Sequence, residues 1–98
     1  MKGLKFEWDE PKNSSNLGKH GVSFEEAETA LADENALLLA DPEHSETEDR
    51  FVLLGLSTSI RLLVVCHCYR EKESVIRIIS ARKADRAERE QYVRRWMK

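Results

Sequence analysis

The stretch VIRIISARK, residues Val75–Lys83, combines the composition of a buried β-strand with three cations. Aliphatic and β-branched residues favour strands, whereas the charge of an arginine cannot be neutralised, so Arg77 needs a specific role among these isoleucines. Side chains alternate along a strand, which places Arg77 and Arg82 on opposite faces. A single site that contains both arginines therefore requires a bulge or bend near Ser80 and Ala81.

Four other segments have the pattern of strands. Arg50–Leu56 and Arg61–Tyr69 precede Ser74–Ala81 with links of hairpin length, which is typical of an antiparallel meander. A short apolar run at Asn35–Ala40 predicts one more strand, and alternation of apolar and charged residues predicts another at Leu4–Trp8. The polar residues 41–49 form a connection.

Capping signals predict three helices. The first begins after Asp9 and ends at Gly21, because glycine closes helices readily. The second begins at Ser23, which forms a capping box with Glu26, and the third begins near Asp85. The apolar face of the third helix consists of Tyr92, Val93, Trp96 and Met97.

The resulting order, β-α-α-β-β-β-β-α, predicts an α+β domain with an antiparallel sheet. Two N-terminal helices and one C-terminal helix pack on it. We expect the helices to cover one face of the sheet and to leave the other free for a ligand. The 98 residues suit a single domain, residues 1–98.

The charge is distributed unevenly along the chain. Met1–Thr58 contains 5 Lys/Arg and 13 Asp/Glu, a formal charge of −8, whereas Ser59–Lys98 contains 11 and 5, a charge of +6. The basic half can attract phosphates although the net charge is −2.

No apolar run approaches the ~18 residues of a membrane helix, and the N-terminus turns acidic before a signal-peptide core could form. We expect a cytoplasmic protein.

Cys66, His67 and Cys68 suggest a metal site, but a structural zinc site needs four ligands. His20 and His44 are too isolated in the sequence to complete one. The two cysteines share one face of their strand and are poorly placed for a disulfide, so we expect reduced thiols. Neither a metal nor a cofactor is predicted.

Several cations have both a structural and a functional interpretation. Lys19 and His20 complement the dipole at the end of the first helix, and this structural interpretation is favoured from spacing alone. Alternatively they serve as a general acid and base or as a phosphate clamp. Arg77 is either a cross-strand partner for a carboxylate or part of a site. The arginines of the last helix are interpreted mainly as its solvated face.

Together these residues resemble the BrnT-type toxins. The resemblance is carried by FEWDEPKN (Phe6–Asn13), NLGKHGVSFEEA (Asn16–Ala27), RLLVV (Arg61–Val65) and IRIISARKA (Ile76–Ala84), and by residues in 41–51 and 88–92. It implies a RelE-like fold and an RNA-cleaving toxin of a type II toxin–antitoxin pair. The implied partner is a ribbon-helix-helix antitoxin of BrnA type, with DNA bound only through the complex.

The resemblance also implies site residues, which are Lys19, His20, Arg61, Arg77 and Arg82. Many members have glycine where this chain has Ile60, which puts the placement of Arg61 in question. Metal-independent cleavage by the RNA 2′-hydroxyl group would use Arg77 and Arg82 on the scissile phosphate and His20 or Lys19 for proton transfer. The expectation is that Arg61, Arg77 and Arg82 converge on one concave surface.

Two other classes of function remain open at this point. One is a nucleic-acid-binding module without catalysis, which would share the basic surface. The other is an interaction protein whose apolar edge strand, Ala36–Ala40, pairs with another chain.

Overall fold

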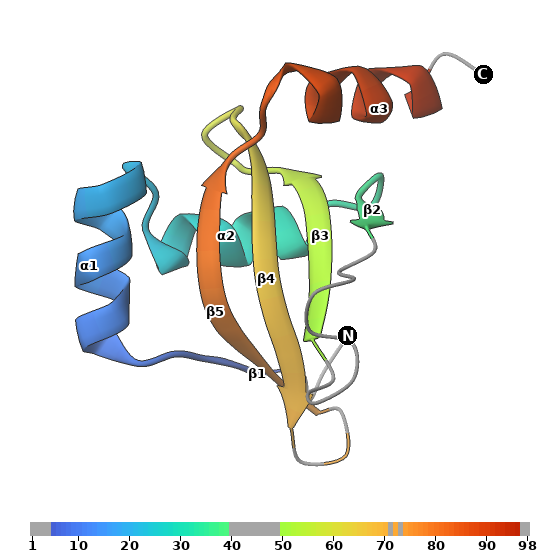
Figure 1. Ribbon diagram of the computed structural model, residues 1–98. Coiled ribbons are helices and arrows are strands. Elements are labelled where there is room, and N and C mark those ends of the chain that lie inside the picture. Colours follow the sequence, from blue (N-terminus) through green and yellow to red (C-terminus); the bar gives the residue numbers. More distant parts are fainter. Residues whose placement is uncertain (1–4, 40–49, 71, 73, 97–98) are drawn as a thin grey trace.

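The computed structural model describes residues 5–39, 50–70, 72 and 74–96, and it confirms the predicted order of elements (Figure 1). The predicted connection 41–49 and the side chains of Trp96 and Met97 lie outside the described residues. The elements are β1 (Lys5–Glu7), α1 (Glu10–His20), α2 (Phe24–Leu31), β2 (Leu37–Leu39), β3 (Arg50–Leu56), β4 (Leu62–Arg70), β5 (Val75–Lys83) and α3 (Arg86–Trp96).

The five strands form one sheet in the order β1-β5-β4-β3-β2. The predicted meander is confirmed for β2 to β5, in which each consecutive pair is antiparallel. In contrast, β1 pairs in parallel with β5, with Phe6 opposite Ile76. The sheet is therefore mixed, and its first and last strands in sequence lie side by side.

A bulge in β5 brings the two arginines of this strand to one face. Cys66 lies opposite Ser80 whereas His67 lies opposite Ile78, so Ile79 is an additional residue between them. Arg77 then faces Cys68 and Arg82 faces Val64, two positions of equal parity on β4. The irregular strand that a shared site required is thus present.

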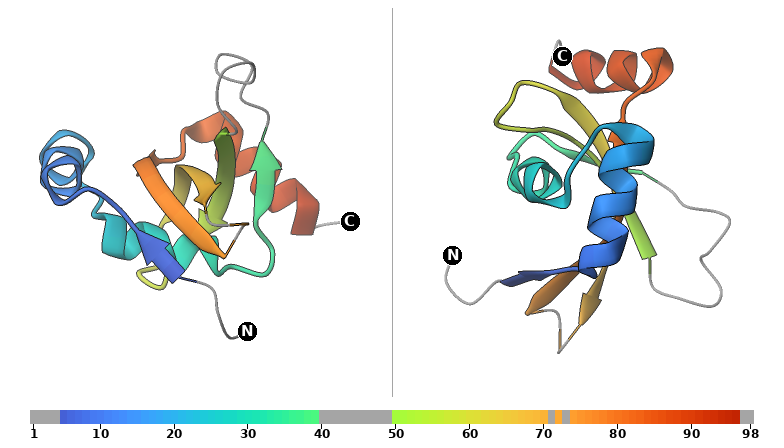
Figure 2. Two further views of the ribbon diagram at one scale, coloured as in Figure 1. Left: turned by 90° about the horizontal axis from the view of Figure 1, so that it is seen from below. Right: turned by 90° about the vertical axis from the view of Figure 1, so that its left-hand side faces the viewer.

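α1 and α2 pack on the first face of the sheet and at its β5 edge. α2 lies across β3, β4 and β5, and α1 runs alongside β5 at the edge of the sheet (Figure 2). α2 approaches β3 closely, because a β-carbon at Gly55 would lie only 2.5 Å from the carbonyl oxygen of Ala30. The buried core on this face consists of Val22, Phe24, Ala27, Ala30, Leu63, Val65, Ile78 and Ala81.

α3 packs against the second face, so the expectation that this whole face is free is wrong. Tyr92 is buried with Leu54 and Val64 and donates a hydrogen bond to Asp33 Oδ2 at 2.7 Å. Burial raises the pKa of Asp33, but hydrogen bonds from the Leu56 and Asn35 amides and from Tyr92 lower it below its ordinary value overall. Tyr92 is a core residue and anchors α3 to the sheet.

Most predicted caps are confirmed. Gly21 ends α1 with φ 71°. Of the predicted capping box at Ser23, only one half forms: Ser23 Oγ accepts from the Glu26 amide at 3.1 Å, whereas the Glu26 carboxylate binds Ser57 and Arg61. Asp85 and Glu88 form a reciprocal capping box, with both bonds at 2.8 Å. Asp9 occupies the predicted cap position of α1 but makes no side-chain cap bond. Within the described part of the chain, the helices are too short and too polar to span a bilayer.

Candidate functional site

Asn16 of α1 holds the helix to the exposed edge of β5. Its side-chain amide donates to the carbonyl oxygens of Ala81 and Val22, each at 2.8 Å, and its Oδ1 accepts from the Ala81 amide at 3.2 Å. Because β1 pairs with β5 only at Val75–Arg77, Asn16 satisfies backbone groups that would otherwise need another strand. The contact fixes α1 next to the bulge.

Asn13, one helical turn earlier, fixes the junction of α1 and α2. Its Oδ1 accepts from the Phe24 amide at 2.8 Å, and its Nδ2 donates to Glu25 at 3.1 Å. No role was assigned to Asn13 or Asn16 from the sequence. The signal was two asparagines three positions apart within a predicted helix, where asparagine is unfavourable unless its amide replaces a backbone partner.

The predicted Lys19 and His20 line a shallow pocket between α1 and β5. The pocket has a volume of about 220 Å³, and its lining residues are Lys12, Ser15, Asn16, Lys19, His20, Ile79 and Ser80. The bulge residue Ile79 therefore forms part of its wall. Ser80 lies on the same face of β5 as Arg77 and Arg82, because its partner Cys66 shares the parity of Cys68 and Val64.

Arg82 and Arg77 share this face, but each one is held by its own carboxylate. Arg82 donates to both oxygens of Glu88, at 2.9 and 2.8 Å, and this guanidinium lowers the pKa of Glu88. Arg77 donates to Glu7 of the neighbouring β1 at 3.0 Å, the cross-strand pairing that was one of its two interpretations. The α-carbons of Arg77 and Arg82 are roughly 13 Å apart, because the residues opposite them on β4, Cys68 and Val64, are four residues apart at ~3.3 Å per residue.

Arg61 lies on the helix side, away from Arg77 and Arg82. It donates through Nε to Glu26 Oε2 at 2.9 Å, pairs with Glu26 Oε1, and donates to the Gly21 carbonyl at 3.0 Å. The hydrogen bonds of Arg61 lower the pKa of Glu26. Arg61 thus anchors the turn that follows His20.

The turn before Arg61 explains why the departure at Ile60 matters. Ile60 has φ 62° and is 77% exposed, in the left-handed region that glycine adopts at little cost. The backbone at position 60 therefore has the conformation that glycine favours, although the residue there is β-branched. Ser57 donates to Glu26 at 2.7 Å and ties this turn to the same carboxylate as Arg61.

The predicted convergence of three guanidinium groups is wrong in this structure. Glu26, Glu7 and Glu88 each neutralise one arginine, and two of these acids come from the acidic half of the chain. The uneven charge along the sequence is therefore partly cancelled by folding. What the structure does bring together is Lys19 and His20 with Ser80, two residues from Arg82.

The Cys-His-Cys segment divides between the two faces. Cys66 and Cys68 share the second face as predicted and form no disulfide, whereas His67 is fully buried on the first. Burial lowers the pKa of His67, and its Nε2 lacks a hydrogen-bond partner among the described residues. Over the same residues, His, Cys, Asp and Glu nowhere gather in a group of three that could hold a metal ion.

Comparisons with known proteins identify a family and similar solved structures. Residues 8–88 match the family described as the ribonuclease toxin BrnT of type II toxin–antitoxin systems. The fold is similar to the crystal structure of the Brucella abortus ribonuclease toxin BrnT, with a TM-score of 0.65 and 26% sequence identity over 85% of this chain and 99% of that one. None of the curated proteins matches the chain.

Proposed function

Because the chain belongs to the BrnT family of ribonuclease toxins, we propose that this endoribonuclease cleaves RNA at the pocket between α1 and β5. The observation that supports this location is the meeting of Lys19 and His20 with Ser80, next to Arg82 on the bulged strand. In this proposal, Lys19 and His20 transfer protons and Arg82 binds phosphate at one end of the sheet. As a type II toxin, the protein has an antitoxin partner and an RNA substrate.

In the proposed mechanism, the 2′-hydroxyl group of the RNA attacks the adjacent phosphorus. A base removes its proton, the bond from O2′ to phosphorus forms, the bond to O5′ breaks, and an acid protonates O5′. The products are a 2′,3′-cyclic phosphate and a 5′-hydroxyl end. His20 and Lys19 supply the proton transfers from opposite sides of this step, and no metal takes part.

The arginines divide the remaining work. Arg82 binds the scissile phosphate. Its planar guanidinium donates to both oxygens of Glu88, and it can donate to two phosphate oxygens with the same bidentate geometry. Arg77, roughly 13 Å along the strand, binds a neighbouring phosphate. Arg61 is a positioning residue, since it acts through the Gly21 carbonyl next to His20. RNA must displace Glu88 and Glu7 to reach the two guanidinium groups.

The test is cleavage of RNA in EDTA by the purified toxin, followed by analysis of the new ends. We expect cyclic phosphate ends, and His20→Ala or Lys19→Ala should lower the rate by about 10²–10⁴-fold, the usual contribution of a general acid or base. The rate should depend less on pH in His20→Ala than in the wild type, because the variant lacks the imidazole that transfers a proton. RNA binding without new ends would instead support a nucleic-acid-binding module.

We further propose that the antitoxin is a ribbon-helix-helix protein and that the pair acts in the cytoplasm, with DNA bound only through the complex. A ribbon-helix-helix coding frame next to this gene, whose product rescues cells from growth arrest, is the expected finding. A neighbouring gene of another fold that rescues equally well would overturn the proposed antitoxin class and leave the ribonuclease activity unaffected.

A further inference from the structure

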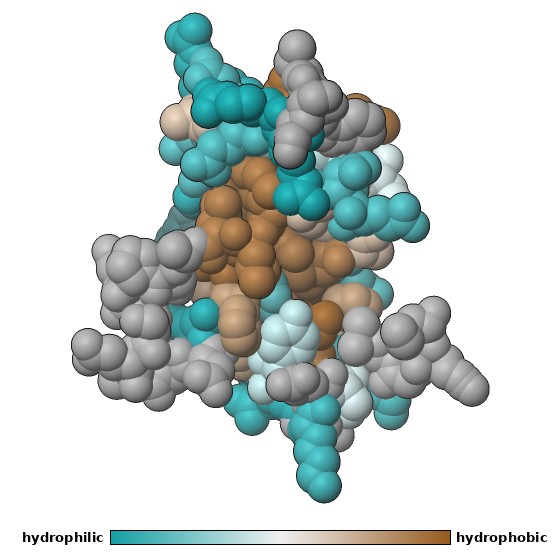
Figure 3. Space-filling model, turned by 90° about the vertical axis from the view of Figure 1, so that its right-hand side faces the viewer, coloured by the Kyte–Doolittle hydropathy of each residue, from teal (hydrophilic) through white to brown (hydrophobic). Residues whose placement is uncertain are grey.

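A groove between β2 and α3 takes no part in the proposed cleavage. β2 lies at the end of the strand order, and Leu37–Leu39 line one wall of a groove of about 440 Å³. Gln91, Arg94 and Arg95 of α3 line the other wall. We call this the β2–α3 groove. Figure 3 shows a contiguous apolar surface on this side of the molecule with hydrophilic residues above it.

The apolar wall of the groove is a cluster of adjacent leucines rather than a single exposed side chain. Leu37 and Leu39 are half-buried against the second core, whereas Leu38, which alternates with them along the strand, leaves on the other side of β2 and is 63% exposed. Apolar side chains that gather in one place and are rimmed by polar ones mark surfaces at which proteins associate. The leucines therefore predict a protein partner that buries them.

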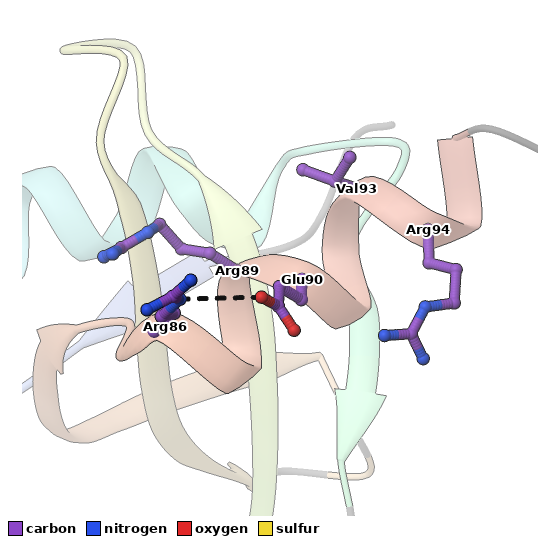
Figure 4. A pocket seen from close by; sticks show the side chains of 5 residues that line it. All are labelled: Arg86, Arg89, Glu90, Val93 and Arg94. Atoms are coloured by element: carbon purple, nitrogen blue, oxygen red, sulfur yellow. Dashed lines mark ion pairs between the residues drawn. The ribbon is translucent and has the colours of Figure 1, made fainter.

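The opposite wall is cationic. The two acidic residues of α3 are already paired: Glu88 binds Arg82, and Glu90 lies 3.6 Å from Arg86. Figure 4 shows the second of these pairs in an adjoining pocket, which is lined by Arg86, Arg89, Glu90, Val93 and Arg94. Arg94 and Arg95, in contrast, make no ion pair within the described chain. A ligand with acidic groups opposite these two arginines would be favoured both in approach and in orientation.

We propose that the β2–α3 groove binds an acidic amphipathic segment of the antitoxin, with its apolar side chains on Leu37–Leu39 and its carboxylates on Arg94 and Arg95. RNA fits these walls less well, because the described lining residues include no aromatic ring on which a base could stack, and phosphates would leave the leucines uncovered. The inference rests on the chain being a toxin with an antitoxin, but not on where or how it cleaves RNA.

The test measures the affinity of the purified toxin for its cognate antitoxin by calorimetry. Leu38→Asp should weaken binding by at least ~30-fold, the range of an interface hot spot. Arg95→Glu should weaken it by roughly 10-fold at low salt and by less at high salt, where charges are screened. Matched controls are Leu17→Asp, a half-exposed leucine of α1, and Lys5→Glu on β1, both of which should bind as the wild type does.

Further measurements separate the alternatives. Reversal of one acidic residue of the antitoxin to lysine should restore binding to Arg95→Glu, which a merely unfolded variant could not show. Wild-type affinity in both Leu38→Asp and Arg95→Glu would overturn the inference. So would weaker RNA binding with unchanged antitoxin binding, or a toxin dimer that Leu38→Asp dissociates. RNA cleavage by the two variants alone should equal that of the wild type; if the wild type cleaves no RNA, the cleavage proposal fails but the affinity test stands.

Discussion

The two faces of the sheet use the same chemical pair, arginine with glutamate, for different purposes. On the helix side, the side chains of Arg61 and Glu26 are 34% and 13% exposed, and the pair is held further by the Gly21 carbonyl and the Ser57 hydroxyl. On the other face, the arginines are similarly exposed, at 45% for Arg82 and 32% for Arg77, but neither of them binds a backbone carbonyl of a distant segment. An ion pair that closes a turn thus contributes to stability, whereas one without such further contacts keeps a cation available for ligand binding.

The largest expected effect concerns the arginines of the second face. Arg82→Ala should reduce the rate of RNA cleavage by about 10²–10³-fold, the cost of losing one electrostatic stabiliser of the transition state. Arg77→Ala should have a smaller effect, mainly on the affinity for RNA, because Arg77 binds a neighbouring phosphate. The melting temperature should change little, because exposed ion pairs contribute weakly. Lys72→Ala in the β4–β5 turn is the control. Full activity of a folded Arg82→Ala protein would remove Arg82 from the mechanism.

Asn16→Ala should have the largest effect on stability. The substitution leaves the Ala81 amide and the carbonyls of Ala81 and Val22 without their partner, which should cost roughly 3 kcal/mol in the free energy of unfolding. Chemical denaturation measures this cost, and Ser14→Ala on the exposed side of α1 should stay within about 0.5 kcal/mol of the wild type. Equal stability of both variants would mean that Asn16 does not hold α1 to β5.

Arg61→Ala should be destabilising by about 2 kcal/mol, because it leaves the largely buried carboxylate of Glu26 without its guanidinium. The matched comparison is Arg70→Ala, whose side chain is 56% exposed and lies 3.6 Å from Glu7. Denaturation should place Arg70→Ala within about 0.5 kcal/mol of the wild type. Similar losses in both variants would contradict the distinction between the two kinds of ion pair.

His67 should make the protein less stable as the pH falls. Burial lowers its pKa in the folded state, so the unfolded chain binds the proton more readily below pH ~6.5. The free energy of unfolding should therefore decline by up to ~1.4 kcal/mol per pH unit below this value. The lowered pKa values of Glu26 and Glu88 act only at more acidic pH, so denaturation between pH 6.5 and 5 isolates His67. The decline should be smaller in His67→Leu, and an identical decline would assign it to other groups.

The smallest effect concerns the turn before Arg61. Ile60→Gly should stabilise the protein by roughly 0.5–1 kcal/mol, since relief of the left-handed strain exceeds the added freedom of glycine in the unfolded chain. Ile60→Val keeps the strain and should show no such gain in thermal unfolding. A loss of stability in Ile60→Gly would show that the Ile60 side chain makes contacts that outweigh the strain.

The elements themselves were predictable because their signals are local. The composition of β5, the glycine at the end of α1 and the caps at Ser23 and Asp85 each depend on residues close in sequence. The bulge was expected only on the condition that Arg77 and Arg82 share one site, because their parity places them on opposite faces of a regular strand. The parallel partner of β1 was not predicted, since three residues of alternating pattern contain no information on their neighbour.

The site was less predictable because it depends on contacts between distant segments. Glu7 and Arg77 are 70 residues apart, and Asn16 and Ala81 are 65 apart. A local pattern identifies Arg61 and Arg82 as cations beside strands but not the acids that hold them. For Lys19 and His20, the local pattern does show a structural role at the end of a helix. Their position beside Ser80 becomes visible only in the folded structure.

The most direct test of the cleavage site is the binding surface of an RNA that cannot be cut. An RNA with deoxyribose at the scissile position lacks the attacking hydroxyl group, so NMR of the intact toxin can map where it binds. The amides of Lys12–His20 and Ile79–Lys83 should shift on titration. Shifts confined to Leu37–Leu39 and Gln91–Arg95 would place RNA in the β2–α3 groove and contradict both the proposed cleavage site and the proposed antitoxin surface.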